Sequence, residues 1–129
     1  DVPEVRDMMP LMHEGWHVSY RPFDILLMPA PWHQGRVVLV GDAAHSLTPQ
    51  LTSGGGMAIE DAVVLADEIE SRDDIETALA AYTDRRFERV RNVYESSLRI
   101  CEIEKGRSSD GAEGTRVLID GLQHLAAPY

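Results

Sequence analysis

The chain has 129 residues, of which 43% are hydrophobic and 26% charged, and this composition is typical of one folded domain or of part of a larger one. Its formal net charge of −10 argues against non-specific binding to nucleic acid or to acidic membrane surfaces. The single cysteine, Cys101, excludes an internal disulfide framework and a cysteine-cluster metal site.

The first third of the chain predicts a short helix followed by extended segments. A helix over residues 3–14 is indicated by apolar side chains on one face and by Pro3 in its first turn. Residues 16–28 predict extended chain, and the two prolines within 29–31 predict a turn or a polyproline segment. The continuous apolar run over 37–40 lies between glycines and predicts a strand that is buried on both faces.

Three helices are predicted in the remainder of the chain, over residues 56–71, about 75–105 and 112–126. Asp74 is the predicted N-cap of the second helix, and Asp110 with Glu113 resembles a capping box before the third. Each helix has an apolar stripe that predicts the face turned to a core. In the first helix the stripe comprises Ile59, Ala62, Val63, Ala66 and Ile69. In the second it comprises Leu79, Tyr82, Phe87, Val90, Tyr94, Leu98 and Cys101. In the third it comprises Val117, Leu118, Gly121, Leu122, Leu125 and Ala126.

Few strands and three main helices do not make an independent doubly wound sheet. The fold class predicted is therefore an α/β fragment that completes a larger α/β protein and supplies its C-terminal part. The chain begins at Asp1 rather than at a methionine, which also suggests a piece of a longer protein. No apolar run approaches the roughly 18 residues of a spanning helix, and no signal segment opens the chain, so we expect a cytoplasmic setting.

The centre of the chain combines the features of a site for a small polar ligand. Gly41 lets the chain leave the predicted strand, and Asp42 then stands at a carboxyl end, where open α/β sheets bind ligands. A carboxylate at this point suits a sugar or polyol hydroxyl. Ala43 and Ala44 allow a close approach of the backbone, and Pro49 stiffens the loop that follows.

The glycines at 54–56 add a second half to this site. They permit positive φ angles and expose backbone N–H groups just before a predicted helix. A helix N-terminus carries partial positive charge and favours an anion or a developing negative charge. A flavin matches both halves, because it has ribityl hydroxyls and a pyrimidine edge that becomes negative on reduction.

The residues of this segment also resemble a known family. The sequence PWHQGRVVLVGDAAH over 31–45, then Pro49, the glycine turn and AIEDA over 58–62, is similar to the second flavin motif of FAD-dependent aromatic-ring hydroxylases. These are the group A flavoprotein monooxygenases with the p-hydroxybenzoate hydroxylase fold. The resemblance covers about residues 30–95, and Arg86 and Arg89 also fit it.

The resemblance implies a domain plan and a cofactor site. Residues 1–29 would be the tail of the substrate domain, and 30–129 the C-terminal part of a FAD/NAD(P)-binding fold with a helical extension. Asp42 would hold the ribityl chain, and Pro49 would line the reaction cavity as the catalytic candidate. The amides of Gly55 and Gly56 would face the flavin N1 and O2 edge. The full cofactor-binding set implied is Gly41, Asp42, Ala43, Pro49, Gly54, Gly55, Gly56 and Met57.

The implied activity is hydroxylation of a small organic, aromatic substrate with O₂, FAD and NAD(P)H as electron donor. The family's Gly-x-Gly-x-x-Gly motif is absent, so the expected partner is a missing N-terminal FAD-binding segment. We expect the fragment alone to bind FAD weakly or not at all and to show no turnover. Related flavin-dependent reductases and epoxidases share an all-glycine turn, although His45 and residues 59–61 favour the hydroxylases. The non-enzymatic alternative is a truncated module that forms homodimers through uncovered apolar helix faces.

Other chemistry is not favoured by the sequence. Asp42 and His45 lack a third ligand at suitable spacing, so no metal site is predicted. His45 is instead predicted to pack or to hydrogen-bond locally. The arginines at 85, 86, 89 and 91 alternate with acidic residues and predict a solvated helix face. Trp16 and Trp32 are predicted to be packing residues, and Cys101 a small buried hydrophobe.

Overall fold

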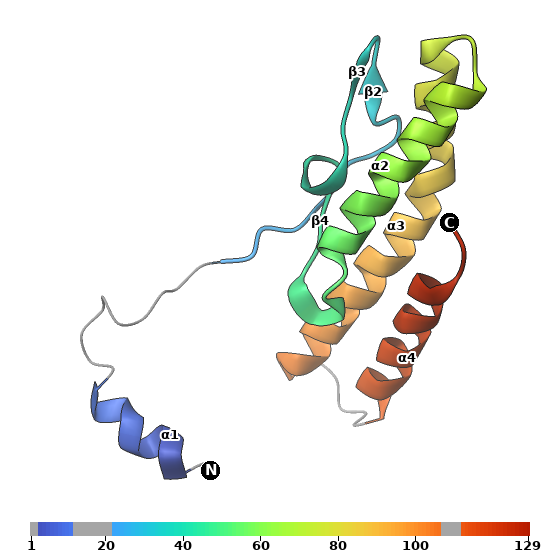
Figure 1. The fold of residues 1–129 in the computed structure, drawn as a ribbon. Helices are drawn as coiled ribbons and strands as arrows, with labels where there is room; N and C mark the ends of the chain where they lie inside the picture. Colours follow the sequence, from blue (N-terminus) through green and yellow to red (C-terminus); the bar gives the residue numbers. More distant parts are fainter. Residues whose placement is uncertain (1–2, 12–21, 107–111) are drawn as a thin grey trace.

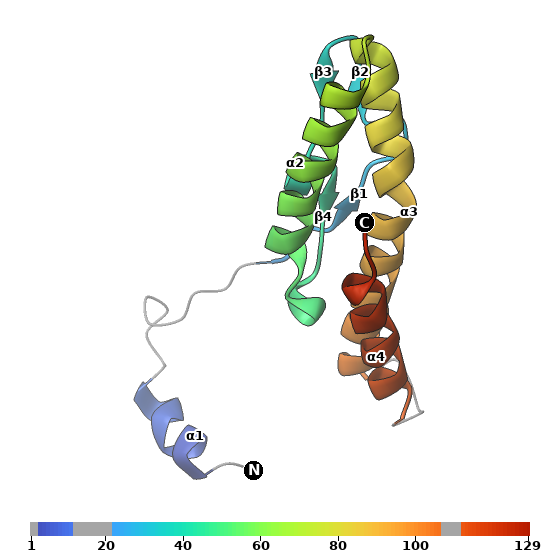
Figure 2. The same cartoon turned by 45° about the vertical axis from the view of Figure 1, so that its right-hand side comes forward.

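The computed structural model describes residues 3–11, 22–106 and 112–129. The long helices are α2 (Gly54–Ser71), α3 (Ile75–Glu104) and α4 (Glu113–Ala126). Figures 1 and 2 show α2 and α3 side by side, with α4 along the second half of α3. The three predicted helices are therefore confirmed, and the described chain is mostly helical with few strands. Nothing in these three ranges forms a helix long and apolar enough to cross a membrane.

The elements before α2 are short. In chain order they are α1 (Pro3–Met8), η1 (Met9–Leu11), β1 (Leu26–Leu27), β2 (His33–Gln34), β3 (Val37–Val38), η3 (Gly41–Ala43), β4 (His45–Ser46) and η4 (Pro49–Leu51), where η marks a 3-10 helix. The predicted helix over 3–14 thus begins as an α-helix and continues as a 3-10 turn to Leu11. Trp16 and the first part of the extended segment predicted over 16–28, residues 16–21, lie outside the described residues.

The start of α3 follows from its capping residue, whereas the N-cap residues of α2 and α4 make no side-chain capping bond. Asp74 accepts hydrogen bonds from the backbone N–H and the hydroxyl of Thr77 at 2.8 and 2.6 Å, which confirms the predicted N-cap of α3. Helix α2 begins at Gly54, two residues earlier than predicted, so all three glycines belong to its first turn. The capping box predicted at Asp110 falls outside the described residues.

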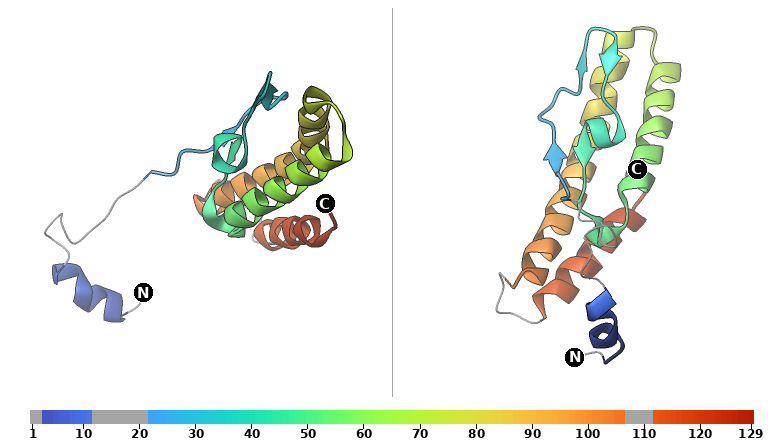
Figure 3. Two further views of the ribbon diagram at one scale, coloured as in Figure 1. Left: turned by 45° about the horizontal axis from the view of Figure 1, so that its top comes forward. Right: turned by 90° about the vertical axis from the view of Figure 1, so that its left-hand side faces the viewer.

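The strands form two small antiparallel ladders. In one, Leu27 of β1 lies opposite His45 of β4, and in the other the hairpin β2–β3 pairs Gln34 with Val37 (Figure 3, right). The prediction of a strand buried on both faces over 37–40 is wrong for this chain, because Val37 is 70% exposed. The cause is the two-stranded ladder, since no further described strand or helix covers the outer face of β3.

Trp32 lies at the centre of the core, as its predicted packing role requires. Its ring is 1% exposed and lies 5.6 to 6.0 Å, between centroids, from the rings of His45, Tyr82 and Phe87. The indole Nε1–H donates to the Met28 carbonyl at 2.9 Å, so its polar group is satisfied. The core thereby joins the loop segment to the inner face of α3.

Helix α2 buries a face that the hydrophobic pattern did not predict. Its buried residues are Met57, Asp61, Val64 and Glu68. The predicted stripe points outward instead, with Ile59 69% and Ile69 45% exposed. This prediction is wrong because two of the buried positions are acids that pair with arginines of α3, an interaction that hydrophobicity alone does not register.

Helix α3 conforms better to its predicted stripe. Leu79, Tyr82 and Val90 are buried, whereas the remaining predicted residues, Cys101 included, are only half-buried. Helix α4 packs on the core through Val117 and Leu125, and its Gly121 lies so close that a Cβ there would meet Leu51 at 3.1 Å and Ser96 at 3.3 Å. Leu118 and Leu122 of its predicted stripe are exposed, because a helix at the edge of the bundle buries a narrower face.

Neighbouring valines on α2 provide a test of which face packs. Val64 is fully buried and Val63 is 40% exposed, although the sequence pattern predicted the reverse. We expect Val64→Ala to lower the free energy of unfolding by about 2 kcal/mol, because two buried carbon groups are lost and a cavity remains. Val63→Ala should change it by no more than about 0.5 kcal/mol. Urea denaturation of both variants measures the difference, and equal losses would contradict this packing.

Candidate flavin site

A groove of about 670 Å³ lies between the turn at Gly41 and the first turn of α2. Its lining comprises Phe23, Val40, Gly41, Asp42, Ser46, Leu47, Thr48, Pro49, Thr52, Ser53, Gly54, Gly55 and Ala58. Five of the eight predicted cofactor-binding residues are therefore brought together at one hollow. The groove also has several hydroxyl groups, from Ser46, Thr48, Thr52 and Ser53, which the sequence analysis did not single out.

Gly41 occupies a position that requires glycine. Its φ is +55°, in the left-handed region, and a Cβ built there would lie 3.0 Å from the Cβ of Ala58 on α2. The chain arrives extended at Val40 and turns directly into η3, so Gly41 opens a 3-10 helix and does not close a strand. Asp42 follows with an exposed side chain on the groove wall.

Gly54 and Gly55 form the other wall of the groove, and the glycine run differs from the prediction. Gly54, Gly55 and Gly56 have no positive φ, since they are the first turn of α2. A Cβ at any of them would meet nothing within 4 Å, which leaves their side of the helix open. The first intrahelical bond is donated by the Met57 N–H to the Ser53 carbonyl at 2.9 Å, so the amides before it have no acceptor within the helix. The predicted electropositive helix start is thus present without special backbone angles.

Pro49 begins η4 at the floor of the groove. The same residue lines a second hollow of about 410 Å³, whose walls include Leu98, Cys101 and Lys105 at the end of α3. Pro49 therefore lines two open spaces, as do Phe23 and Thr48. Of the other predicted residues, Ala43 is exposed beside the groove, and the side chain of Met57 is fully buried in the core, where only its backbone could face a ligand.

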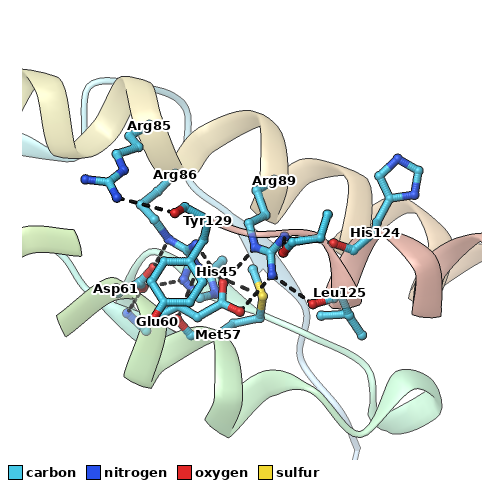
Figure 4. Close-up of polar contacts among 12 residues, drawn as sticks. His45, Met57, Glu60, Asp61, Arg85, Arg86, Arg89, His124, Leu125 and Tyr129 are labelled. Carbon is cyan, nitrogen blue, oxygen red and sulfur yellow. Dashed lines mark hydrogen bonds and ion pairs between the residues drawn. The ribbon is translucent and has the colours of Figure 1, made fainter. Parts of the chain in front are cut away.

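A buried charge network underlies the groove and was missed by the sequence analysis (Figure 4). Asp61 is fully buried, and its Oδ2 accepts the Gly41 N–H at 2.8 Å and lies 2.6 Å from Nε2 of His45. Its Oδ1 accepts from Nε of Arg86, also fully buried, at 2.7 Å. His45 packs against Trp32, as predicted, but its hydrogen bond is not local, because its partner is 16 residues away.

Glu60 and Arg89 extend the network to α4. Glu60 accepts from Arg86 at 2.7 Å and from Arg89 at 2.7 and 2.8 Å. Arg89 also donates to the carbonyls of His124, Leu125 and Ala127 at 2.7 to 3.0 Å, which satisfies the C-terminal end of α4 (Figure 4).

The predicted solvated face is wrong for two of the four arginines. Arg86 is fully buried and Arg89 is 12% exposed, whereas Arg85 and Arg91 are 38% and 43% exposed at their side chains. A signal for Arg86 was available, since it lies four residues after Tyr82 and four before Val90 and so shares the buried stripe. A charged residue at helical spacing from buried apolar residues indicates an ion pair buried in the core.

The network keeps its carboxylates ionised. Burial by itself raises the pKa of Asp61, but hydrogen bonds from His45, the Gly41 amide and Arg86 outweigh it and hold the pKa below the ordinary carboxyl value. Burial likewise raises the pKa of Glu60, and the bonds from Arg89 and Arg86 again bring it below its usual value. Among the described ranges, no group of three His, Cys, Asp or Glu side chains is placed to hold a metal ion.

Comparison with known proteins identifies the kind of domain. A family model described as "FAD binding domain" matches residues 26–97, which include every groove residue except Phe23, and also Asp61 with its partners Gly41, His45 and Arg86. No solved structure gives a significant match.

Three relatives illustrate the similarity. The chain is 36% identical over 120 residues to the aurachin C monooxygenase/isomerase of Stigmatella aurantiaca, covering 80% of this chain and 30% of the relative. It is 43% identical over 74 residues to the FAD-dependent urate hydroxylase of Klebsiella pneumoniae, covering 57% and 19%. It is 36% identical over 87 residues to the kynurenine 3-monooxygenase of Xanthomonas euvesicatoria, covering 67% and 19%. The chain thus spans less than a third of the length of each of these curated relatives.

Removal of the buried arginine should be far more costly than removal of an exposed one. Arg86→Met leaves Asp61 as an uncompensated buried charge, and we expect a loss of about 3–5 kcal/mol in the free energy of unfolding. Arg91→Met, a matched change on the same helix at a side chain 43% exposed, should cost no more than about 1 kcal/mol. Chemical denaturation followed by circular dichroism measures both losses. A similar small loss for the two variants would contradict the buried pair.

Proposed function

The chain belongs to the FAD-dependent monooxygenase family that carries this FAD binding domain, and on this basis we propose that it supplies the ribityl and isoalloxazine side of a flavin site. The observation that carries the proposal is the groove that faces the exposed carboxylate of Asp42 on one side and the open helix start at Gly54 and Gly55 on the other. A carboxylate that accepts hydroxyl protons and a helix N-terminus that favours negative charge match the two chemical halves of a flavin.

Four residues at the groove or next to it have roles in this proposal. The carboxylate of Asp42 accepts hydrogen bonds from ribityl hydroxyls. The amides of Gly55 and Gly56 stabilise negative charge at the pyrimidine edge, and the absence of Cβ atoms there allows the ring to approach the backbone. Pro49 borders both the groove and the second hollow, and it lines the reaction cavity. FAD, when bound, supplies the redox and oxygen-transfer chemistry, with NAD(P)H as the electron donor.

The substrate that we propose is a small aromatic compound. The names of two relatives, a urate hydroxylase and a kynurenine 3-monooxygenase, support this class without selecting one member of it. We further propose that residues 1–29 end a substrate domain and 30–129 complete a FAD-binding domain of the p-hydroxybenzoate hydroxylase type. The short coverage of the relatives supports this plan, in which an N-terminal FAD-binding segment supplies the remaining contacts to the cofactor.

The outward face of α2 supports the need for such a partner. Ile59, Val63 and Ile69 are 69%, 40% and 45% exposed along this helix. Apolar side chains gathered in this way on a surface mark a contact face. We propose that the N-terminal segment of the longer protein covers this face, and that a second copy of the chain covers it when that segment is absent.

Binding of FAD to the chain tests the proposed site. Because only half of the contacts are present, we expect weak binding, seen as shifts of the amide resonances of Gly41, Asp42, Gly54 and Gly55 during a nuclear magnetic resonance titration. Asp42→Ala should reduce the affinity, whereas the matched change Asp84→Ala at an exposed position of α3 should not. Shifts scattered away from the groove would contradict the proposal, and absent shifts would mean that the groove does not bind FAD without the N-terminal segment.

Self-association tests the outward face of α2. Sedimentation velocity at increasing concentration should show a dimer that Ile59→Glu converts to a monomer, because a charge buried in an apolar interface is strongly unfavourable. Ile119→Glu provides the control, since Ile119 is 51% exposed on α4. A monomer at all concentrations, or equal effects of both changes, would count against this use of the face.

A further inference from the structure

The turn that leads to Asp42 is held from both sides. The Gly41 N–H donates to Oδ2 of Asp61 at 2.8 Å, and its carbonyl accepts the Ala44 N–H at 2.9 Å. Gly41 itself has the left-handed φ of +55° and contacts α2 at Ala58. The direction in which the chain continues to Asp42 therefore depends on Gly41. The backbone N–H of Gly41 is fixed in turn by the buried side chain of Asp61 on α2.

Asp61 is itself fixed by buried partners. An ionised carboxylate only accepts hydrogen bonds, so His45 donates through Nε2 to the same oxygen that accepts the Gly41 amide. Arg86 donates to the other oxygen and balances its charge. With three donors on a side chain that is fully buried, Asp61 has one orientation available to it.

We propose that Asp61 is a positioning residue of the flavin site: its carboxylate holds the Gly41 turn and so aims the Asp42 carboxylate into the groove. This inference rests on the proposed function for the identity of the ligand, but the hold on Gly41 is independent of it. Asp61 does not line the groove, and it acts only through Gly41 and Asp42. His45 and Arg86 set its orientation and its charge.

A second buried acid of α2 offers a matched control. Glu68 is 6% exposed and, like Asp61, is bonded to an arginine of α3, with 3.1 Å between its Oε1 and Nη1 of Arg85. Its carboxylate partners are the side chains of Arg85 and Arg72, and it does not bond the Gly41 turn. Glu68→Gln therefore removes a buried charge from the same helix without reaching the groove.

The experiment compares Asp61→Asn with Glu68→Gln in this chain, using two probes. Flavin mononucleotide has a ribityl chain, and lumiflavin has the same ring system with a methyl group in its place. We expect Asp61→Asn to shift the Gly41 amide resonance and to speed the hydrogen exchange of this amide. We also expect it to weaken binding of flavin mononucleotide roughly tenfold, because the Asp42 carboxylate loses one charge-assisted hydrogen bond to the ribityl chain. Lumiflavin binding should not change, and Glu68→Gln should alter none of these readouts.

A second pair of variants covers the case in which Asp61→Asn does not fold. His45→Leu removes one donor to Oδ2 while filling the space with an apolar side chain, and we expect a smaller shift of the Gly41 amide together with weaker binding of flavin mononucleotide. His45→Gln retains a donor and should restore both. A merely structural role for the network would not distinguish the two flavins or the two His45 variants.

Each outcome decides the inference. An unchanged Gly41 amide in folded Asp61→Asn or in His45→Leu would overturn it, as would equal weakening of both flavins or the same losses in Glu68→Gln. If the unaltered chain binds neither flavin, the groove does not bind flavin without the N-terminal segment, and the Gly41 amide alone decides the inference. A shifted Gly41 amide in Asp61→Asn would then still support the hold of Asp61 on the turn, and an unchanged amide would overturn it.

Discussion

The structure depends on the buried ion pair between Asp61 of α2 and Arg86 of α3. Both side chains are fully buried, so each has lost its hydration and is tolerated in the core only because the other is present. The 2.7 Å bond between Oδ1 and Nε fixes how the two helices align along their length. Because the other oxygen of Asp61 accepts the Gly41 amide, the same pair also places the loop that lines the groove.

The groove is built from elements that are individually weak structures. A two-residue strand, two 3-10 turns and the first turn of one helix form its walls, and none of these would keep its shape alone. They are held by Trp32 and His45 packed against α3 and by the hydrogen bonds of Asp61. The polar surface of the groove is therefore exposed and open, while the bonds that define its shape lie beneath it in the core.

The hydrophobic pattern of α2 does not identify the face of this helix that is buried in the core. Ile59, Val63 and Ile69 form a regular apolar stripe, and an amphipathic helix is ordinarily expected to bury such a stripe. In this chain the inner face carries Asp61 and Glu68, which are neutralised by arginines of α3. The exposed stripe is consistent with a chain that spans under a third of the length of its relatives, because hydrophobic periodicity reflects every contact a helix makes, including contacts to other parts of a longer protein.

The sequence by itself determined the three helices, the N-cap at Asp74, the packing role of Trp32 and the family to which the flavin motif belongs. These depend on local spacing, capping chemistry and short-range order, all of which are readable along the chain. Only the tertiary structure decided which face of α2 is buried, that Gly54 to Gly56 are helical, and that Arg86 lies in the core. A buried charge is stable only with its partner, and the partner of Arg86 is 25 residues away on another helix. The hydrophobic periodicity of one helix therefore cannot predict that Arg86 is buried.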